Sequence, residues 1–179
     1  KYGFHGISHA YIAETVEKIF QQEEHAKENV KIISCHLGNG ASICAIKEQQ
    51  SVNTSMGFTP IDGLMMGSRC GSIDPMIIPY LVERQQMPIH EVKKLLNEAS
   101  GLLGISEMSN DMRDLIQAAR EGNQKATLAI EMFVNRVAHT IASYIVDLDG
   151  LDALVFTGGI GENAALIRSL IVDKLQVFG

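Results

Sequence analysis

A hairpin pattern near the start of the chain restricts the fold more than any other feature. The apolar run at residues 30–35 stops at Gly38-Asn39-Gly40, and a second apolar run follows at residues 41–46. Asn-Gly between two such runs is the strongest short signal for a β-hairpin. A further strand pattern at residues 50–55 extends the predicted meander. Consecutive antiparallel strands do not fit a simple series of β-α-β units.

Helical periodicity dominates the rest of the chain. It predicts helices over residues 8–25, 75–86, 88–98, 111–121 and 124–147. Ser8 is the candidate cap of the first helix, and Asp74-Pro75 forms the start of the second. The apolar stripe of the first helix comprises Ile12, Val16, Ile19 and Phe20. The stripe of the longest helix comprises Ile130, Val134, Val137, Ile141 and Ile145.

Two irregular segments interrupt these helices, and a different unit ends the chain. Residues 56–73 are rich in Gly and Met and poor in charge, and loops of this length are more often functional than filler. Residues 101–110 form the second predicted loop. Residues 152–157 then predict a buried strand, residues 158–162 a tight turn, and residues 163–175 a helix. The order of these elements predicts an α/β fold.

The composition is that of a folded domain. The chain has 179 residues, of which 46% are hydrophobic and 20% charged, enough for a substantial core. The net charge, 15 basic minus 21 acidic residues, is −6. That balance argues against nonspecific binding to nucleic acid or anionic membranes, because no basic surplus exists to replace counterions.

The sequence predicts a cytoplasmic protein without a membrane partner. No apolar run has the length of a bilayer span, and no secretory signal opens the chain. Cys35, Cys44 and Cys70 lack the paired spacing of a zinc site, and an odd number of cysteines fits a reducing compartment. The chain begins without Met and stops directly after an amphipathic helix, so we expect it to be a piece of a longer protein.

The segment Gly158-Gly159-Ile160-Gly161-Glu162-Asn163 lies between a predicted strand and a predicted helix. Glycines allow close approach of a ligand, and unpaired amides at a helix N-terminus favour anions. A tight connection without a ligand is the simpler alternative. Gly159, Gly161 and Ala164 also match a loose dinucleotide pattern, Gly-x-Gly-x-x-Ala. The acidic residue of that pattern belongs about 20 residues further on, and the chain ends first.

Two further glycine-rich segments carry polar side chains. The segment from His36 to Gly40 is the tip of the predicted hairpin. It can be only a turn, or its backbone amides and the Asn39 amide can hold a phosphate. Arg69 is the one charged residue of Gly67-Ser68-Arg69-Cys70-Gly71-Ser72, and the planar guanidinium suits bidentate contact with phosphoryl oxygens. A solvated loop arginine is the alternative.

Two histidines stand four residues apart in Phe4-His5-Gly6-Ile7-Ser8-His9. That spacing on a helix suits a metal, but a third ligand and a Glu at the usual position are missing. A polar histidine near the junction of a loop and a helix is the simpler interpretation. Of the two, His5 is the better candidate for contact with a substrate. The segment from Ser109 to Asp114 most simply predicts a capped helix start with charges on the first turn.

Taken together and in this order, the motifs closely resemble the acetate kinase (acetokinase) family. They are the segments Tyr2–His9, His36–Gly40, Met66–Pro75, Ser109–Asp111 and Phe156–Asn163, and the resemblance covers essentially the whole chain. It implies a two-lobed fold of the superfamily that unites sugar kinases, heat-shock chaperones and actin. This chain resembles the C-terminal, nucleotide-binding lobe, a ribonuclease H-like (actin-like ATPase) lobe with a mixed β-sheet flanked by helices.

The resemblance also implies an activity. The intact protein is expected to be a phosphotransferase that moves the γ-phosphoryl group of ATP to acetate and reversibly forms acetyl phosphate and ADP. It is also expected to use Mg²⁺ and to form a homodimer, whereas this chain alone is expected to be inactive. A propionate or butyrate kinase relative, a noncatalytic nucleotide-binding module and an NAD-binding domain are the alternatives.

Residue roles follow from the same motifs. His5 and Arg69 are expected to contact the transferring phosphoryl group. The nucleotide is expected to contact His36, Gly38, Asn39, Gly40, Asp111, Met112, Arg113, Gly159, Ile160, Gly161 and Asn163. Of these, Asp111 and Arg113 are assigned to the ribose and base, and the Gly159–Gly161 segment to the adenosine. No metal ligand is assigned in this chain, because the family's Mg²⁺-linked glutamate lies outside it.

Overall fold

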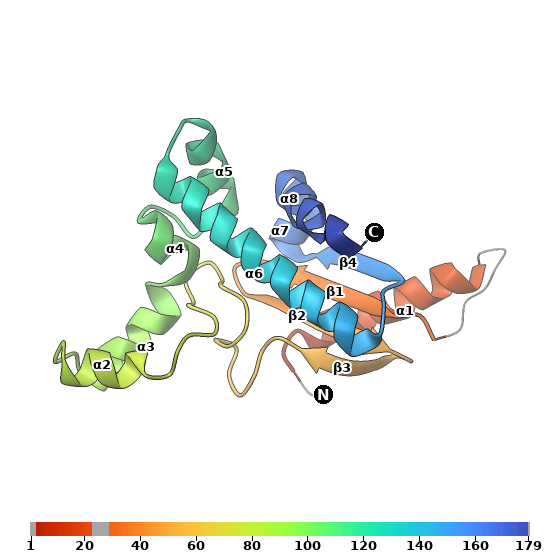
Figure 1. The fold of residues 1–179 in the computed structure, drawn as a ribbon, viewed down its shortest axis with the longest axis horizontal. Helices are drawn as coiled ribbons and strands as arrows, with labels where there is room; N and C mark the ends of the chain where they lie inside the picture. Colours follow the sequence, from red (N-terminus) through yellow and green to blue (C-terminus); the bar gives the residue numbers. More distant parts are fainter. Residues whose placement is uncertain (1–2, 23–28, 179) are drawn as a thin grey trace.

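A four-stranded mixed β-sheet forms the centre of the protein. The computed structural model describes residues 3–22 and 29–178 (Figure 1). The strands are β1 (Ile32–Leu37), β2 (Ala41–Lys47), β3 (Gln50–Thr54) and β4 (Ala153–Thr157), in the order β3-β2-β1-β4. The first three strands form the predicted antiparallel meander, and β4 joins β1 in parallel.

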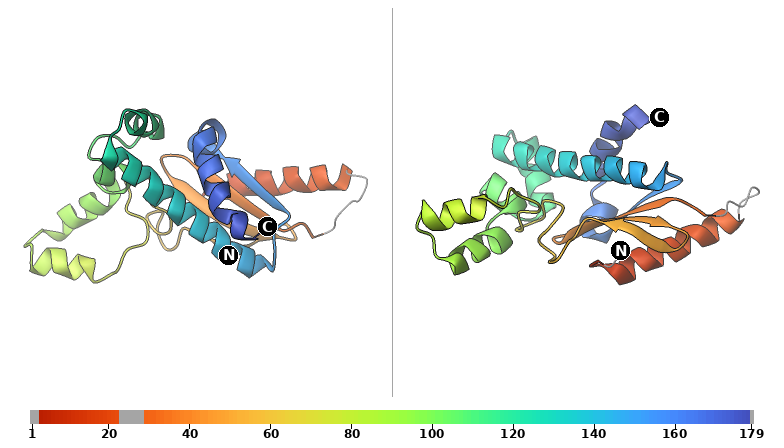
Figure 2. Two further views of the ribbon diagram at one scale, coloured as in Figure 1. Left: turned by 45° about the horizontal axis from the view of Figure 1, so that its top comes forward. Right: turned by 60° about the horizontal axis from the view of Figure 1, so that its bottom comes forward.

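Helices cover both faces of the sheet. Helix α6 (Gln124–Leu148) packs on one face, and α1 (Gly6–Gln22) packs on the other (Figure 2). The remaining helices are α2 (Ile77–Glu83), α3 (Ile89–Glu98), α4 (Gly101–Ser106), α5 (Met112–Arg120), α7 (Gly158–Asn163) and α8 (Ala165–Leu175), with a final 3₁₀ turn, η1 (Gln176–Phe178).

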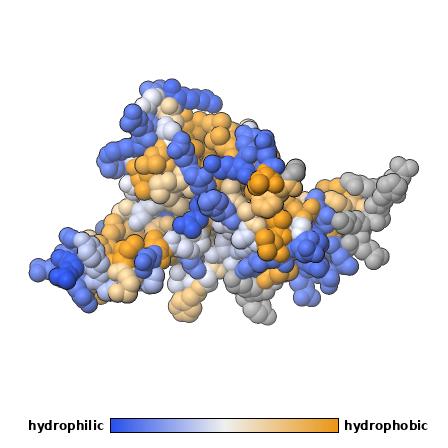
Figure 3. All heavy atoms as spheres, viewed as in Figure 1, coloured by the Kyte–Doolittle hydropathy of each residue, from blue (hydrophilic) through white to orange (hydrophobic). Residues whose placement is uncertain are grey.

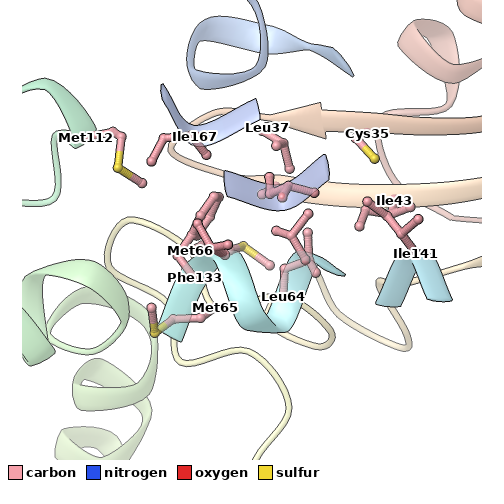
Figure 4. Close-up of a cluster of buried hydrophobic side chains, with 14 of the residues drawn as sticks. Cys35, Leu37, Ile43, Leu64, Met65, Met66, Met112, Phe133, Ile141 and Ile167 are labelled. Atoms are coloured by element: carbon pink, nitrogen blue, oxygen red, sulfur yellow. The ribbon is translucent and has the colours of Figure 1, made fainter. Parts of the chain in front are cut away.

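Alternation along β1 divides the core in two. Ile33, Cys35 and Leu37 point to the α6 side, where a large cluster includes Phe133 and Ile141 (Figure 4). The intervening residues of β1 point to α1, where a smaller cluster contains Ala13, Val16, Ile32, Cys44 and Ile46. Because strand side chains alternate between faces, one strand serves both layers. Four residues of the predicted α6 stripe are buried, and Ile145 packs against them.

The two hairpin turns use different backbone geometry. Glu48 and Gln49, between β2 and β3, both have positive φ, as a two-residue primed turn requires. None of Gly38, Asn39 and Gly40 has positive φ, and Gly38 N donates to Gly40 O at 3.1 Å. The hairpin prediction is confirmed, but this turn does not need glycine to adopt its backbone conformation.

The first helix begins earlier than predicted. It starts at Gly6, directly after His5, which has φ 57°, so Ser8 lies inside the helix and does not cap it. Its buried residues are His9, Ala13 and Val16, whereas Ile19 of the predicted stripe is 51% exposed. The predicted end at residues 23–25 lies outside the described residues.

Three other boundaries differ from the sequence prediction. Residues 101–106, predicted as loop, form the short helix α4. Helix α2 starts two residues after Pro75, although the Asp74 carboxylate accepts a hydrogen bond from Met76 N at 2.9 Å. The predicted glycine turn at residues 158–162 is itself helical, as α7. Strand β4 is partly buried along its length, because it lies at the edge of the sheet.

Helices α2 and α3 form a hairpin that projects away from the sheet (Figure 1). Helix α2 has no buried residue, and α3 has only Val92. Apolar residues are visible on this hairpin at the lower left of Figure 3. Among the residues of α2 and α3, Ile77, Tyr80 and Ile89 are 40%, 56% and 63% exposed. Among residues 3–22 and 29–178, no helix is both long and apolar enough to cross a membrane.

Candidate functional site

A cavity of about 510 Å³ opens between the β1–β2 hairpin, the start of α5, and α7. Ligand sites commonly have a volume of about 300–1,000 Å³. The predicted residues that line it are Gly38, Asn39, Asp111, Met112, Arg113, Gly159, Ile160 and Asn163. Three further lining residues, Asn110, Ile116 and Ala164, were not assigned from the sequence. Segments far apart in the chain therefore meet around one cavity.

The cavity has an apolar side and a polar side. Met112 is buried and belongs to the α6-side core, and Ile116, Ile160 and Ala164 pack against that core (Figure 4 labels Met112). The polar side consists of the Asn39, Asn163 and Asp111 side chains together with exposed backbone. An apolar wall with a few polar groups suits a flat heterocycle with a polar substituent.

Asp111 and Arg113 are paired at the start of α5. The Asp111 carboxylate caps the helix by accepting from Arg113 N at 2.9 Å. It also accepts from Arg113 Nε at 3.0 Å and Arg113 Nη2 at 2.5 Å. These hydrogen bonds lower the pKa of Asp111 to about 2, so the carboxylate is ionised at neutral pH. The predicted helix cap is confirmed.

Helix α7 presents only part of the glycine-rich segment to the cavity. Gly159 is exposed, and a Cβ added there would meet no atom within 4 Å, whereas Gly161 is buried against the Phe156 backbone. Gly161 does not line the cavity, contrary to its predicted role, because it lies on the side of α7 that packs on β4. Glu162 accepts from Gly158 N at 3.2 Å and from Thr157 Oγ1 at 3.0 Å, which fixes the start of α7.

Asn39 joins this cavity to the loop that carries Arg69. Gly67 N donates to Asn39 O at 3.1 Å, and Asn110 Nδ2 donates to Asn39 Oδ1 at 3.4 Å. A Cβ on Gly67 would overlap Asn39 Oδ1. Gly67 is therefore required for close packing against the hairpin.

The loop around Arg69 is held by the start of α4. Leu102 N donates to Met66 O, Leu103 N to Gly67 O, and Ser100 N to Ser68 O, each at 2.9 Å. Gly101 has φ 60°, and a Cβ there would lie 2.7 Å from Arg69 O. This close backbone packing needs glycine at position 101 and fixes the backbone of the loop that carries Arg69.

The Arg69 guanidinium is partly buried, and its partners are neutral. Nη1 donates to Pro60 O at 3.0 Å and contacts Met66 Sδ at 3.7 Å. Within residues 3–22 and 29–178, no carboxylate pairs with it. A cation held without a counter-anion is suited to bind an anionic ligand.

Gly40 lies beside both Arg69 and His5. A Cβ on Gly40 would lie 3.3 Å from Arg69 Nη1 and 3.8 Å from His5 Nε2. Since Gly40 does not have positive φ, its lack of a side chain serves the approach of these two groups. The predicted residues His5, Gly40 and Arg69 thus meet in one place, beside the hairpin tip.

Three imidazole rings cluster next to this place. His5 and His36 stack with centroids 4.1 Å apart and planes inclined by 26°, and His9 lies 6.4–6.5 Å from both. Burial and the neighbouring cationic groups lower the pKa of His5. Burial lowers the pKa of His36 and that of His9, the latter to about 4. His36 lines the imidazole cluster rather than the cavity assigned to it from the sequence.

The described residues offer no metal site of their own. Within that part of the chain, no group of three or more His, Cys, Asp or Glu side chains could hold a metal ion. Cys35 and Cys44 are buried and Cys70 is partly buried, and none of the three forms a disulfide within the described residues.

The comparison with protein families decides the affiliation of this chain. The acetokinase family model matches residues 1–179, which is the full length. The chain belongs to the acetokinase family. Acetate kinases and propionate kinases are similar to this chain at nearly equal sequence identity. An acetate kinase of Methanosarcina mazei is 50% identical over the whole chain, and a propionate kinase of Citrobacter rodentium is 52% identical. The chain spans 43% and 44% of their lengths.

Solved structures agree with this family. A propionate kinase from Francisella tularensis superposes with a TM-score of 0.92 at 50% identity. The acetate kinase of Porphyromonas gingivalis superposes with a TM-score of 0.92 at 38% identity. Each match covers all of this chain and 45% or 44% of the other. A ROK hexokinase from Thermus thermophilus, 14% identical with a TM-score of 0.50, shares the fold alone.

Proposed function

We propose that the intact protein transfers the γ-phosphoryl group of ATP to acetate, reversibly forming acetyl phosphate and ADP. In this proposal the chain is a nucleotide-binding lobe of a two-lobed kinase. One observation carries it: the hairpin tip at residues 38–40 borders the 510 Å³ cavity on one side and the His5–Arg69 pair on the other. A nucleotide in the cavity would therefore have its phosphates directed toward the Arg69 guanidinium, which forms no ion pair with a carboxylate of the described residues.

The cavity is the proposed nucleotide site. The adenine would lie against the apolar wall of Met112, Ile116 and Ile160, with Asp111 and Arg113 near the ribose. Exposed Gly159 leaves room for a flat group to approach α7. The Asn39 amide and the backbone at Gly38 and Gly40 would contact the phosphates.

The His5–Arg69 pair is the proposed phosphoryl site. Phosphoryl transfer depends on in-line positioning and on positive charge near the equatorial oxygens. The Arg69 fork can donate two hydrogen bonds, and His5 Nε2, which lies near the same face of Gly40, can donate one. No general base is needed, because a carboxylate substrate is already a nucleophile.

Mg²⁺ is expected to accompany the nucleotide, held by its phosphates. The described residues contain no cluster that fits the ion, so no step is assigned to it here. We also propose a cytoplasmic homodimer for the intact protein. The three cysteines, which form no disulfide within the described residues, and the exposed apolar side chains of the α2–α3 hairpin are compatible with this. A monodisperse monomer in light scattering would contradict the dimer.

Propionate is the second candidate acceptor, because propionate kinases are as similar to this chain as acetate kinases are. The dinucleotide alternative fits poorly: Gly159 and Gly161 lie inside α7, and the preceding sheet is a mixed meander. A noncatalytic module would not need a guanidinium beside the hairpin that no carboxylate of residues 3–22 and 29–178 pairs with.

The test is acyl phosphate formation by the intact protein with ATP and a series of acids from formate to butyrate, trapped with hydroxylamine. We expect the highest kcat/KM with acetate. A higher value with propionate would shift the assignment to that substrate, and no product with any acid, despite ATP binding, would exclude this class of kinase.

A further inference from the structure

A row of polar side chains crosses the face of the sheet that α1 covers. Ser34 and His36 are two residues apart on β1 and therefore point to the same face of the sheet. Ser42 of β2 lies directly opposite His36. Ser34 and Ser42 are fully buried, and His9 of α1 is 5% exposed. Buried polar groups at the interface of a helix and a sheet are costly unless each is paired, so their partners are informative.

Hydrogen bonds link these residues into an unbranched chain that ends at His5. Ser34 Oγ lies 2.9 Å from His9 Nδ1, and Ser42 Oγ lies 2.9 Å from His9 Nε2. The same Ser42 Oγ lies 2.9 Å from His5 Nδ1. His5 Nε2, the other ring nitrogen, lies near Gly40 on the side of Arg69.

Counting hydrogens couples the two rings. A hydroxyl has one hydrogen to donate, and a neutral imidazole has one N–H and one acceptor nitrogen. A hydroxyl oxygen can also accept twice, but acceptance from both rings would leave the hydrogen of the buried Ser42 without either ring as its acceptor. Ser42 is therefore expected to donate to one imidazole and to accept from the other. If Ser42 donates to His5 Nδ1, the hydrogen of His5 must be on Nε2. His9 Nε2 then donates to Ser42, and Ser34 donates to His9 Nδ1.

The opposite direction would spoil the site. His5 Nδ1 would donate to Ser42, and Nε2 would turn a lone pair toward the phosphoryl oxygens. A phosphoryl anion near Arg69 therefore selects the direction in which every bond donates toward it. Bonds aligned head to tail in this way strengthen one another.

The surroundings keep the rings neutral. The groups that face His5 are the His36 ring, the His9 ring and the Arg69 guanidinium. Burial, the His36 ring and the Arg69 cation disfavour a charged His5, whereas Glu162 acts in the opposite direction on His36, where burial outweighs it. His36 is held in its stacked position by Ser8, whose Oγ lies 2.9 Å from His36 Nδ1. The pKa values of all three histidines are lowered, which agrees with this geometry.

We propose that Ser42, supported by His9 and Ser34, is a positioning residue that holds His5 with its hydrogen on Nε2, ready to donate to the transferring phosphoryl group. The inference rests on the proposed function, because it assigns His5 Nε2 a phosphoryl oxygen as its partner. Outer-shell partners of this kind fix the tautomer and the orientation of a functional histidine.

The test combines kinetics with a spectrum that reads the tautomer. In the intact protein, Ser42→Ala should lower kcat about 10- to 100-fold, with little change in the KM for ATP. Ser143→Ala, on the exposed side of α6, is the matched control and should have no effect. The tautomer is read from long-range ¹H–¹⁵N spectra of ¹⁵N-histidine-labelled protein with ADP and inorganic phosphate bound. These spectra should show His5 protonated on Nε2. The His5 signals are identified as those that disappear in the His5→Asn variant.

The tautomer readout separates the possible failures. The proposal would be overturned by the wild-type protein alone if its His5 near pH 7 is the neutral tautomer protonated on Nδ1 or the doubly protonated imidazolium. Retention of the Nε2–H form in Ser42→Ala would also overturn it, even if activity falls. If Ser42→Ala does not fold, Ser34→Ala, which does not touch His5, should still shift the His5 signals. Failure of the proposed function would appear differently, as a wild-type protein without acyl phosphate activity.

Discussion

Asn39 packs directly against Gly67, with Gly67 N donating to Asn39 O at 3.1 Å and no room for a Cβ beside Asn39 Oδ1. This contact joins the cavity to the Arg69 loop, so the two proposed half-sites are built as one unit. Displacing the Asn39 side chain should therefore disturb the nucleotide phosphates before it disturbs the core.

Gly67→Ala should turn the Asn39 side chain away and weaken ADP binding about tenfold. The loss of one or two hydrogen bonds costs about 0.5–1.5 kcal/mol each, and about 1.4 kcal/mol is a factor of ten. The check is a double-mutant cycle with Asn39→Ala, measured by calorimetry. The double variant should bind ADP no more weakly than Asn39→Ala alone, and additive losses would mean that Gly67 acts elsewhere.

Gly159→Ala should weaken ADP binding without lowering the melting temperature. A Cβ at this helical position meets no protein atom within 4 Å, and alanine is the better helix former. A loss of affinity would therefore report contact with the ligand itself. Unchanged affinity in a stable variant would show that the nucleotide does not approach α7 closely.

Arg69→Ala should lower kcat by about three to five orders of magnitude with little change in ADP affinity, as for other arginines that stabilise transferring phosphoryl groups. The reason is that Arg69 lies beyond the hairpin tip and not in the cavity. Steady-state kinetics and ADP titration of the same variant separate the two effects. Arg84→Ala, at the exposed end of α2, is the matched control. Near-normal turnover in Arg69→Ala would remove Arg69 from the mechanism.

Acidification should destabilise the fold between about pH 6.5 and pH 4. Burial lowers the pKa of His9 from 6.5 to about 4, so the unfolded chain binds more protons in this range. The contribution of His9 is complete above pH 6.5 and is lost as the pH falls through the folded pKa. At about 1.4 kcal/mol per pKa unit it amounts to about 3 kcal/mol.

Urea unfolding at a series of pH values measures this dependence. His9→Asn should reduce the slope of the unfolding free energy between pH 6.5 and pH 4, and a residual slope should come from His5 and His36, whose pKa values are also lowered. His139→Asn, at an exposed position of α6, should keep the full slope. An unchanged slope in His9→Asn would assign the acid sensitivity to other groups.

The sequence predicted the meander, the long helix α6 and the capped start of α5, because each depends on local patterning. It missed α4, whose six residues are too few for periodicity and whose first residue has φ 60°. It described residues 158–162 as a turn, because glycine is a poor helix former. Packing against Cys35 and Phe156 and the hydrogen bonds from Glu162 override that preference.

The candidate site was only partly predictable for a similar reason. The motif residues Asn39, Asp111 and Ile160 could be named from the sequence, and they meet at one cavity. Ser34 and Ser42 could not, because a serine in a strand carries no signal until its cross-strand partner and the covering helix are known. His9 was similarly interpreted as a polar residue at a helix start, although the early start of α1 turns it inward.

The central claim is that the cavity between Asn39, Arg113 and Ile160 binds an adenine nucleotide. Calorimetric titration of the intact protein with ADP and Mg²⁺, beside NADH, tests it most directly. The account predicts saturable binding of ADP at one site per chain and no binding of NADH. Binding of NADH without binding of ADP would contradict it.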